Sequence, residues 1–219
     1  MPLEIVDNPQ PDPIADLLMV DAYMRWALMA AEEIVGQGMP ALLRESSLER
    51  FIGHYPANEV RLGDATFRDY ASLNAGLLNY FGPTGRNTAL RIGRLSARLG
   101  LQQQESGFEL TLTNAARLLP YPAQHHLGME MMQSVYRQTL GQGWDGRVQD
   151  RRLTTAYVTR CCPMCAGKQA PRPICWIFTG TLQEGVLWMT GKLFDVEQTA
   201  CRAMGAPECV WEVSKTPAQ

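Results

Sequence analysis

The residues best suited to chemistry in this 219-residue chain are its six cysteines, all of which fall in the last quarter. They are Cys161, Cys162, Cys165, Cys175, Cys201 and Cys209. The chain opens with acidic residues and prolines instead of the basic and then apolar pattern of an export signal, so we expect a cytoplasmic protein. Because disulfides rarely persist in a reducing cytoplasm, clustered cysteines indicate a metal site or redox chemistry.

A C-P-x-C turn, Cys162 to Cys165, is the first half of a metal-site pattern. Its proline fixes one φ angle, and two residues separate the sulfurs, which suits a pair of thiolate ligands. Cys201 and Cys209 flank a Gly/Pro turn between two expected strands, so their sulfurs can meet across it, and Cys175 begins a helix. Zinc is the default ion for a tetrahedral thiolate site, and five thiolates are candidates for its four positions.

Two other interpretations of the cysteines stay open. A redox-active C-x-x-C would follow a strand and begin a helix inside a βαβ unit, and proline followed by methionine is not its usual content. Free cysteine is also a small, readily buried residue, so all six can be ordinary thiols. The wide gap to Cys201 gives an iron–sulfur cluster no positive support. Cys161 is the spare, because its side chain should point away from that of its neighbour.

Hydrophobic periodicity and turn residues predict the elements that position these groups. Residues 1–13 contain three prolines and predict an extended, mobile arm. Helices are expected at 13–36, 39–45, 66–81, 86–101, 109–119, 124–142 and 174–190, and strands at 147–160, 193–201 and 208–215. The chain is therefore predicted to form one domain over 14–219, with a helical part at 14–143 and an α/β part at 144–215.

Three polar features of the helices have both a structural and a functional interpretation. Asn74 lies within an apolar stripe, so its amide faces either a neighbouring backbone or a ligand. Arg91 and Arg94 share a helix face, which either binds an anion or is simply solvated. The adjacent His125 and His126 point about 100° apart on a helix and cannot chelate one ion together, which favours ordinary histidines.

Four stretches together resemble the 4-vinyl reductase-like domain. They are the run from Cys162 to Gly167, Ile174-Cys175-Trp176, Gly180 to Glu184, and Val196 to Trp211. Upstream, residues 67–94 resemble the helical part of predicted hydrocarbon-binding proteins of the same family. That bacterial family is known for binding small apolar molecules, occurs in proteins linked to bacteriochlorophyll synthesis, and forms the sensor domains of activators that respond to aromatic compounds.

The resemblance implies an α+β fold, with helices packed on an antiparallel sheet as in nitric-oxide-sensor and transport-particle domains, and a homodimer. It also implies zinc, which the aromatic sensors hold through a cysteine, a glutamate and two further cysteines. The matching positions are Cys175, Gln198, Cys201 and Cys209. A neutral amide such as Gln198 is a poor zinc ligand, so the fourth ligand would be Cys162, Cys165 or Glu197. Such a thiolate-filled site leaves no position for water and would be structural.

The function expected is non-catalytic binding of a small apolar ligand: a hydrocarbon, lipid or tetrapyrrole. A net charge of −2 argues against nucleic acid as a partner, four charges interrupt the longest apolar stretch, so no membrane span is expected, and no catalytic set or nucleotide loop is visible. The candidate ligand-binding residues are Phe67, Tyr70, Asn74, Arg91, Arg94, Trp176 and Trp188. Two alternatives are an accessory factor or reductase for the vinyl group of a (bacterio)chlorophyll precursor, which would need an external reductant, and a dimerising interaction module.

Overall fold

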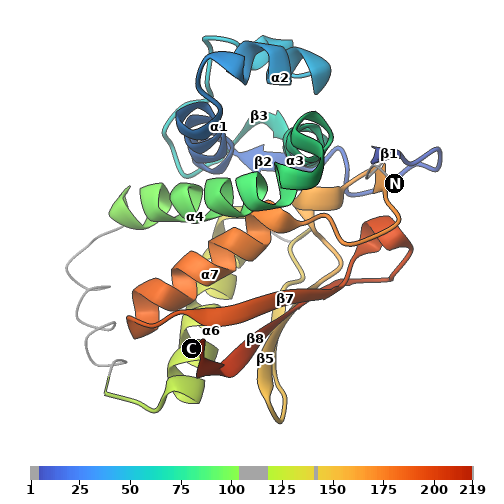
Figure 1. The fold of residues 1–219 in the computed structure, drawn as a ribbon. Coiled ribbons are helices and arrows are strands. Elements are labelled where there is room, and N and C mark those ends of the chain that lie inside the picture. The colour runs from blue at the N-terminus through green and yellow to red at the C-terminus, as the bar shows by residue number, and fades with distance from the viewer. Residues whose placement is uncertain (1–4, 104–117, 141–142, 219) are drawn as a thin grey trace.

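The computed structural model describes residues 5–103, 118–140 and 143–218. Helices occupy most of the N-terminal half, and a four-stranded antiparallel sheet occupies the C-terminal part (Figure 1). One large cluster of buried apolar residues draws on both parts. The expected α+β class, with helices packed on an antiparallel sheet, is confirmed.

The N-terminal half contains four of the helices and three short strands. Its elements are β1 (Val6–Asp7), β2 (Leu18–Val20), α1 (Asp21–Val35), α2 (Met39–Glu45), β3 (Leu62–Thr66), α3 (Phe67–Phe81) and α4 (Gly85–Gln103). Helix α3 begins at a capping box, in which the hydroxyl of Thr66 accepts from the backbone of Asp69 and the Asp69 carboxylate accepts from the backbone of Thr66. It ends at Gly82, whose φ of 52° most other residues avoid.

The C-terminal part builds the sheet and the two helices beside it. Its elements are α6 (Tyr121–Leu140), β4 (Arg147–Asp150), β5 (Thr154–Thr159), β6 (Lys168–Gln169), α7 (Trp176–Thr190), β7 (Phe194–Ala200) and β8 (Cys209–Pro217). The strand order is β4-β5-β8-β7, with antiparallel neighbours. Tyr157 pairs with Trp211 across β5 and β8, and both are fully buried, so this face of the sheet belongs to the core.

Helices α4 and α7 cross at glycines. A Cβ on Gly93 would lie 1.9 Å from the carbonyl oxygen of Ile177, and a Cβ on Gly180 would lie 2.2 Å from that of Leu90. Side chains therefore cannot separate the two backbones at the crossing, and α4 lies directly over α7 (Figure 1). The hydroxyl of Thr181 donates to the carbonyl of Gly93 at 3.4 Å across the same contact.

Residues 5–13 lie along the turn that follows the C-P-x-C motif. Strand β1 pairs with β6, and the backbone of Asn8 donates to the carbonyl of Gly167. The carboxylate of Asp12 accepts from the backbone N–H of Gly167 at 2.9 Å and pairs with Arg202 at 2.9 Å. These contacts hold the segment against the part of the chain that contains the cysteines.

The structure divides three of the expected elements differently. Within the helix expected at 13–36, Leu18–Val20 form β2 because they pair with Leu62–Thr66, a strand that the sequence analysis missed. The strand expected at 147–160 is the hairpin of β4 and β5, which turns between Asp150 and Thr154. The helix expected at 109–119 falls largely on 104–117, outside the described residues.

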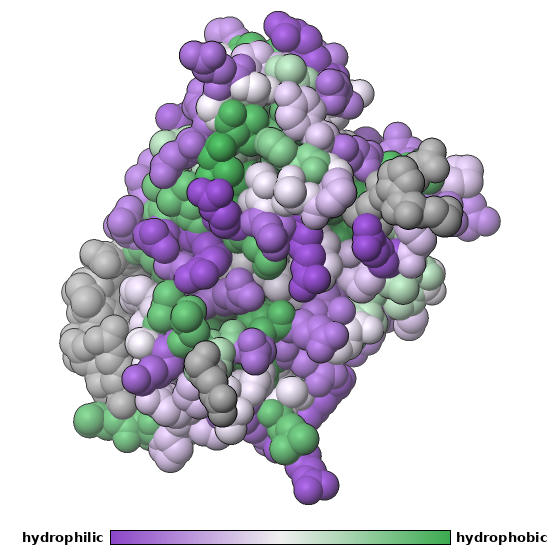
Figure 2. Space-filling model, viewed as in Figure 1, coloured by the Kyte–Doolittle hydropathy of each residue, from purple (hydrophilic) through white to green (hydrophobic). Residues whose placement is uncertain are grey.

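The surface offers no broad apolar face in the view of Figure 2, where patches of hydrophobic residues are divided by hydrophilic ones. Among the described residues, we find no helix whose length and apolar content would let it cross a membrane.

Candidate functional site

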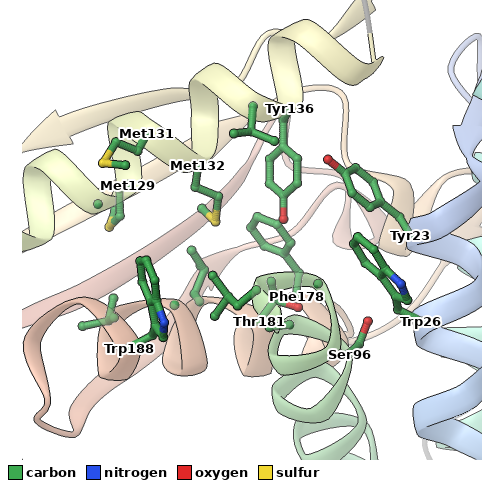
Figure 3. A pocket seen from close by; sticks show the side chains of 18 of the residues that line it. Tyr23, Trp26, Ser96, Met129, Met131, Met132, Tyr136, Phe178, Thr181 and Trp188 are labelled. Carbon is green, nitrogen blue, oxygen red and sulfur yellow. The ribbon is translucent and has the colours of Figure 1, made fainter. Parts of the chain in front are cut away.

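A cavity of about 210 Å³ lies between α1, α4, α6 and α7 (Figure 3). Aromatic rings form much of its wall: Tyr23, Trp26, Tyr70, Tyr136, Trp144, Phe178 and Trp188. Methionines form another large part: Met19, Met129, Met131, Met132, Met164 and Met189. Thioethers are flexible and polarisable and make favourable contacts with rings, so this wall suits a flat apolar molecule.

His125 is a polar residue in this apolar wall. Its side chain is only 1% exposed, and neither ring nitrogen has a hydrogen-bond partner. Burial, with a smaller contribution from the charge of Lys215, lowers the pKa of His125 to about 4. The ring packs edge-on against Phe194, with centroids 4.1 Å apart. At neutral pH, His125 is therefore an uncharged imidazole with one donor and one acceptor available, whereas the adjacent His126 is exposed.

Several other polar groups of the wall are already engaged with the protein. The hydroxyl of Tyr23 lies 3.1 Å from that of Thr139. The indole N–H of Trp144 donates to Gln133 at 2.7 Å, and the hydroxyl of Thr181 donates to a backbone carbonyl of its own helix. These groups shape the wall, and His125 retains capacity for a ligand.

The cavity wall includes two of the seven residues expected to bind ligand, Tyr70 and Trp188. Outside it lie Phe67, Asn74, Arg91, Arg94 and Trp176. Asn74 is fully buried, and its amide nitrogen donates to the carbonyls of Met164 at 3.1 Å and Ile174 at 2.9 Å. The structural interpretation of Asn74, an amide that faces neighbouring backbone, is the one that the contacts support.

The arginines and Trp176 have other neighbours. Arg94 pairs with Glu184 of α7 at 3.2 Å, and Arg91 is exposed on α4. The guanidinium of Arg86 lies over the ring of Trp176, 4.2 Å from its centroid. The arginine face of α4 therefore meets α7 and solvent instead of the cavity.

Sequence reasoning missed most of the cavity residues on α1 and α6. Tyr23 and Trp26 of α1 and Met132 and Tyr136 of α6 all point toward the same space (Figure 3). The cluster of methionines in α6, three within four positions, was the available signal, because such a density on one helix is unusual for a plain core.

Four buried cysteines form a cage that could hold a metal ion. Their ligand atoms lie within 4.8 Å of one another and belong to Cys162, Cys165, Cys175 and Cys209. The Sγ atoms of Cys165 and Cys209 are 3.5 Å apart, and those of Cys162 and Cys175 are 3.7 Å apart. Hydrogen bonds from neighbouring thiols, that of Cys162 first, lower the pKa of Cys165 to about 6, which favours a thiolate in the cage.

The remaining cysteines differ in position. Cys201 is fully buried, with its Sγ 3.7 Å from that of Cys175, so it is a fifth thiol at the side of the cage. The backbone of Cys161 donates to Asp145 at 3.1 Å, and burial raises the pKa of its thiol to about 12. Cys161 is thus a protonated thiol outside the group of four.

The two other candidates for a fourth ligand are placed away from that role. The amide oxygen of Gln198 accepts from the backbone of Cys175 at 3.0 Å, and its nitrogen donates to the carbonyl of Ala200 at 3.2 Å. Both ends of this amide are therefore bound to backbone. Glu197 is exposed on the other face of β7. The glutamine that replaces the family's glutamate positions a cysteine backbone.

Residues 157–215 match the family model of the 4-vinyl reductase domain, which confirms the resemblance described above. A comparison with curated proteins found no match. The H-NOX domains are similar in structure over most of both chains, at 12–14% identity.

Three solved structures illustrate this likeness. One described as "Probing the function of heme distortion in the H-NOX family" has a TM-score of 0.58 at 12% identity and covers 92% of this chain and 97% of its own. An oxygen-binding H-NOX domain related to soluble guanylate cyclases has a TM-score of 0.55 at 14% identity and covers 91% and 96%. An H-NOX protein mutant from K. algicida has a TM-score of 0.55 at 13% identity and covers 90% and 96%. At these identities, the likeness shows a shared fold.

Proposed function

Starting from a 4-vinyl reductase domain at residues 157–215 and an H-NOX-like fold, we propose that this chain is a non-catalytic binding protein for a small apolar molecule that carries one hydrogen-bonding group. The observation that carries the proposal is His125, a neutral imidazole with two unpartnered nitrogens in an apolar cavity. Buried polar groups normally have partners, so a ligand that supplies one would be bound more tightly than a pure hydrocarbon.

The size of the cavity limits the ligand. An apolar cavity of about 150 Å³ in another protein accommodates benzene, and the cavity here is about 210 Å³. Aromatic rings and thioethers on opposite sides favour a planar molecule. We therefore propose a substituted benzene or a fused bicyclic compound with a hydroxyl or carbonyl group.

The H-NOX structures raise the question of heme, which is named for one of them. The residues of this chain do not fit it. Sites for drug-sized ligands span about 300–1,000 Å³, whereas the cavity here is about 210 Å³. Among its described lining residues there is no lysine or arginine to pair with the two carboxylates of a heme. His125 alone resembles an axial ligand, and the same arguments disfavour other tetrapyrroles.

We further propose that zinc occupies the cage of four cysteines and has a structural role. A four-thiolate set is typical of closed zinc sites. The ion would join the C-P-x-C turn, the first turn of α7 through Cys175, and the start of β8 through Cys209. We expect one zinc per chain by mass spectrometry, retained in Cys201→Ser and lost in Cys209→Ser. Equal loss in both variants would place Cys201 in the ligand set.

Binding of 1-naphthol to the zinc-loaded protein, followed by tryptophan fluorescence, tests the ligand proposal. Naphthalene is the matched compound without the hydroxyl. We expect 1-naphthol to bind about fivefold more tightly, because one hydrogen bond contributes about 1 kcal/mol. The difference should vanish in His125→Leu and remain in His126→Gln, the exposed neighbour. Absence of naphthol binding, or equal affinity for both compounds in the wild type, would contradict the proposal.

A homodimer and a cytoplasmic location stay predictions from the resemblance and the sequence. Sedimentation of the zinc-loaded chain at micromolar concentration tests the first, with a dimer mass expected. A monomer mass at every concentration would overturn it.

A further inference from the structure

The C-P-x-C turn faces two sites at once. Its two cysteines, Cys162 and Cys165, belong to the thiol cage, and its two inner residues, Pro163 and Met164, line the cavity. The turn is a single short 3-10 helix with all four residues buried. A shift of the sulfurs by a few tenths of an ångström must therefore also move part of the cavity wall, because close-packed interiors transmit such displacements.

Helix α7 has the same double role. Its N-cap is Cys175, and the backbone of Thr179 donates to the carbonyl of Cys175 at 3.0 Å in the first turn. Phe178 and Leu182 line the cavity within the first two turns (Figure 3 shows Phe178). The position of the cage sulfur therefore sets where the cavity-lining part of α7 begins.

Asn74 joins these two walls. Its amide nitrogen donates both to the carbonyl of Met164 and to that of Ile174, and these are the residues directly before Cys165 and Cys175. The amide comes from α3, so the turn and the start of α7 are held on a common support. One wall of the cavity and half of the thiol cage thus form a single packed unit.

We propose that metal occupancy of the cage and ligand binding in the cavity are thermodynamically coupled, with Met164 as the positioning residue between them; this inference rests on the proposed function. Zinc–sulfur bonds of about 2.3 Å fix tetrahedral sulfurs about 3.8 Å apart. Without the ion, the thiols are held only by packing and weak hydrogen bonds, so the Met164 wall samples more arrangements. Metal binding selects the arrangement that accepts ligand, and by linkage ligand binding raises metal affinity by the same factor.

The test compares the dissociation constant of 1-naphthol for zinc-loaded protein and for protein stripped with a chelator. We expect binding about tenfold weaker without zinc, within the range of typical couplings. Met164→Ala should bring the ratio between the two states toward one while zinc still binds. The matched control is Met131→Ala, which truncates a cavity-lining thioether on α6, away from the cage, and should weaken binding equally in both states.

A second measurement covers the case in which the stripped protein unfolds. In protein loaded with Co²⁺, 1-naphthol should shift the visible absorption bands of the tetrathiolate ion, and Met164→Ala should abolish the shift. No naphthol binding to the zinc-loaded protein would overturn the proposed function itself. Naphthol binding that leaves the cobalt bands unchanged would overturn the coupling and leave the proposed function standing, as would equal affinity for the folded stripped and loaded forms.

Discussion

The buried imidazole of His125 makes the free energy of unfolding depend on pH in a way that can be isolated by one substitution. Burial lowers the pKa of His125 from 6.5 to about 4 in the folded chain. Between these values, the unfolded chain binds a proton at this site that the folded chain does not bind. Stability from this residue is therefore fully present above pH 6.5 and is lost as the pH falls toward 4.

The magnitude follows from the shift. A difference of about 2.5 pKa units at 1.36 kcal/mol per unit is roughly 3 kcal/mol. Replacing His125 with leucine removes the titrating group and keeps an apolar side chain in the wall. The free energy of unfolding of His125→Leu should then fall less between pH 7 and pH 4 than that of the wild type, by roughly 3 kcal/mol.

Urea denaturation at half-unit intervals from about pH 4 to 7.5 measures the difference. The cysteines and carboxylates titrate in both proteins, so subtracting one profile from the other leaves the contribution of His125. His126→Gln is the control, because the neighbouring imidazole is exposed and its replacement should leave the wild-type profile unchanged. If the profiles of wild type and His125→Leu run parallel, the imidazole has a partner or solvent access that the structure does not contain.

Two further substitutions test the packing around the site. Asn74→Ala leaves two buried carbonyls without their donor and should lower the free energy of unfolding by about 2–3 kcal/mol, seen as a melting temperature roughly 5–10 °C lower; an unchanged melting temperature would refute the clamp. Gly93→Ala should destabilise severely because its Cβ meets backbone of α7, whereas Gly185→Ala, with no atom within 4 Å of the added Cβ, should melt like the wild type. Equal effects of the two glycine substitutions would show that α4 and α7 are not in backbone contact.

The helices and the cysteine grouping were predictable because their signals are local. Thr66 caps a helix through its own neighbours, and Gly191 ends one in a left-handed conformation that favours glycine. The C-P-x-C spacing likewise predicts paired thiolates without reference to the rest of the chain. Strand β2 could not be read from such signals, because three residues at the edge of an amphipathic stretch become a strand only by pairing with Leu62–Thr66.

The cavity wall was not predictable in the same way. Whether Arg94 faces solvent or a partner depends on Glu184, 90 residues further along the chain. Trp176 and Trp188 lie on the same helix and have similar hydrophobicity, but Trp188 lines the cavity and Trp176 lies under Arg86. Periodicity identifies which residues share a face, while the crossing of helices decides what that face meets.

The glycine crossing of α4 and α7 also has a consequence for how this binding site can diversify. Because backbone meets backbone at Gly93 and Gly180, the floor formed by these two helices accepts almost no new side-chain volume there. The opposite wall, α6, contributes the thioethers of Met129, Met131 and Met132, which repack at little energetic cost (Figure 3). Changes in ligand preference, by evolution or by engineering, should therefore accumulate on α6, while the floor stays constant and keeps selecting flat molecules.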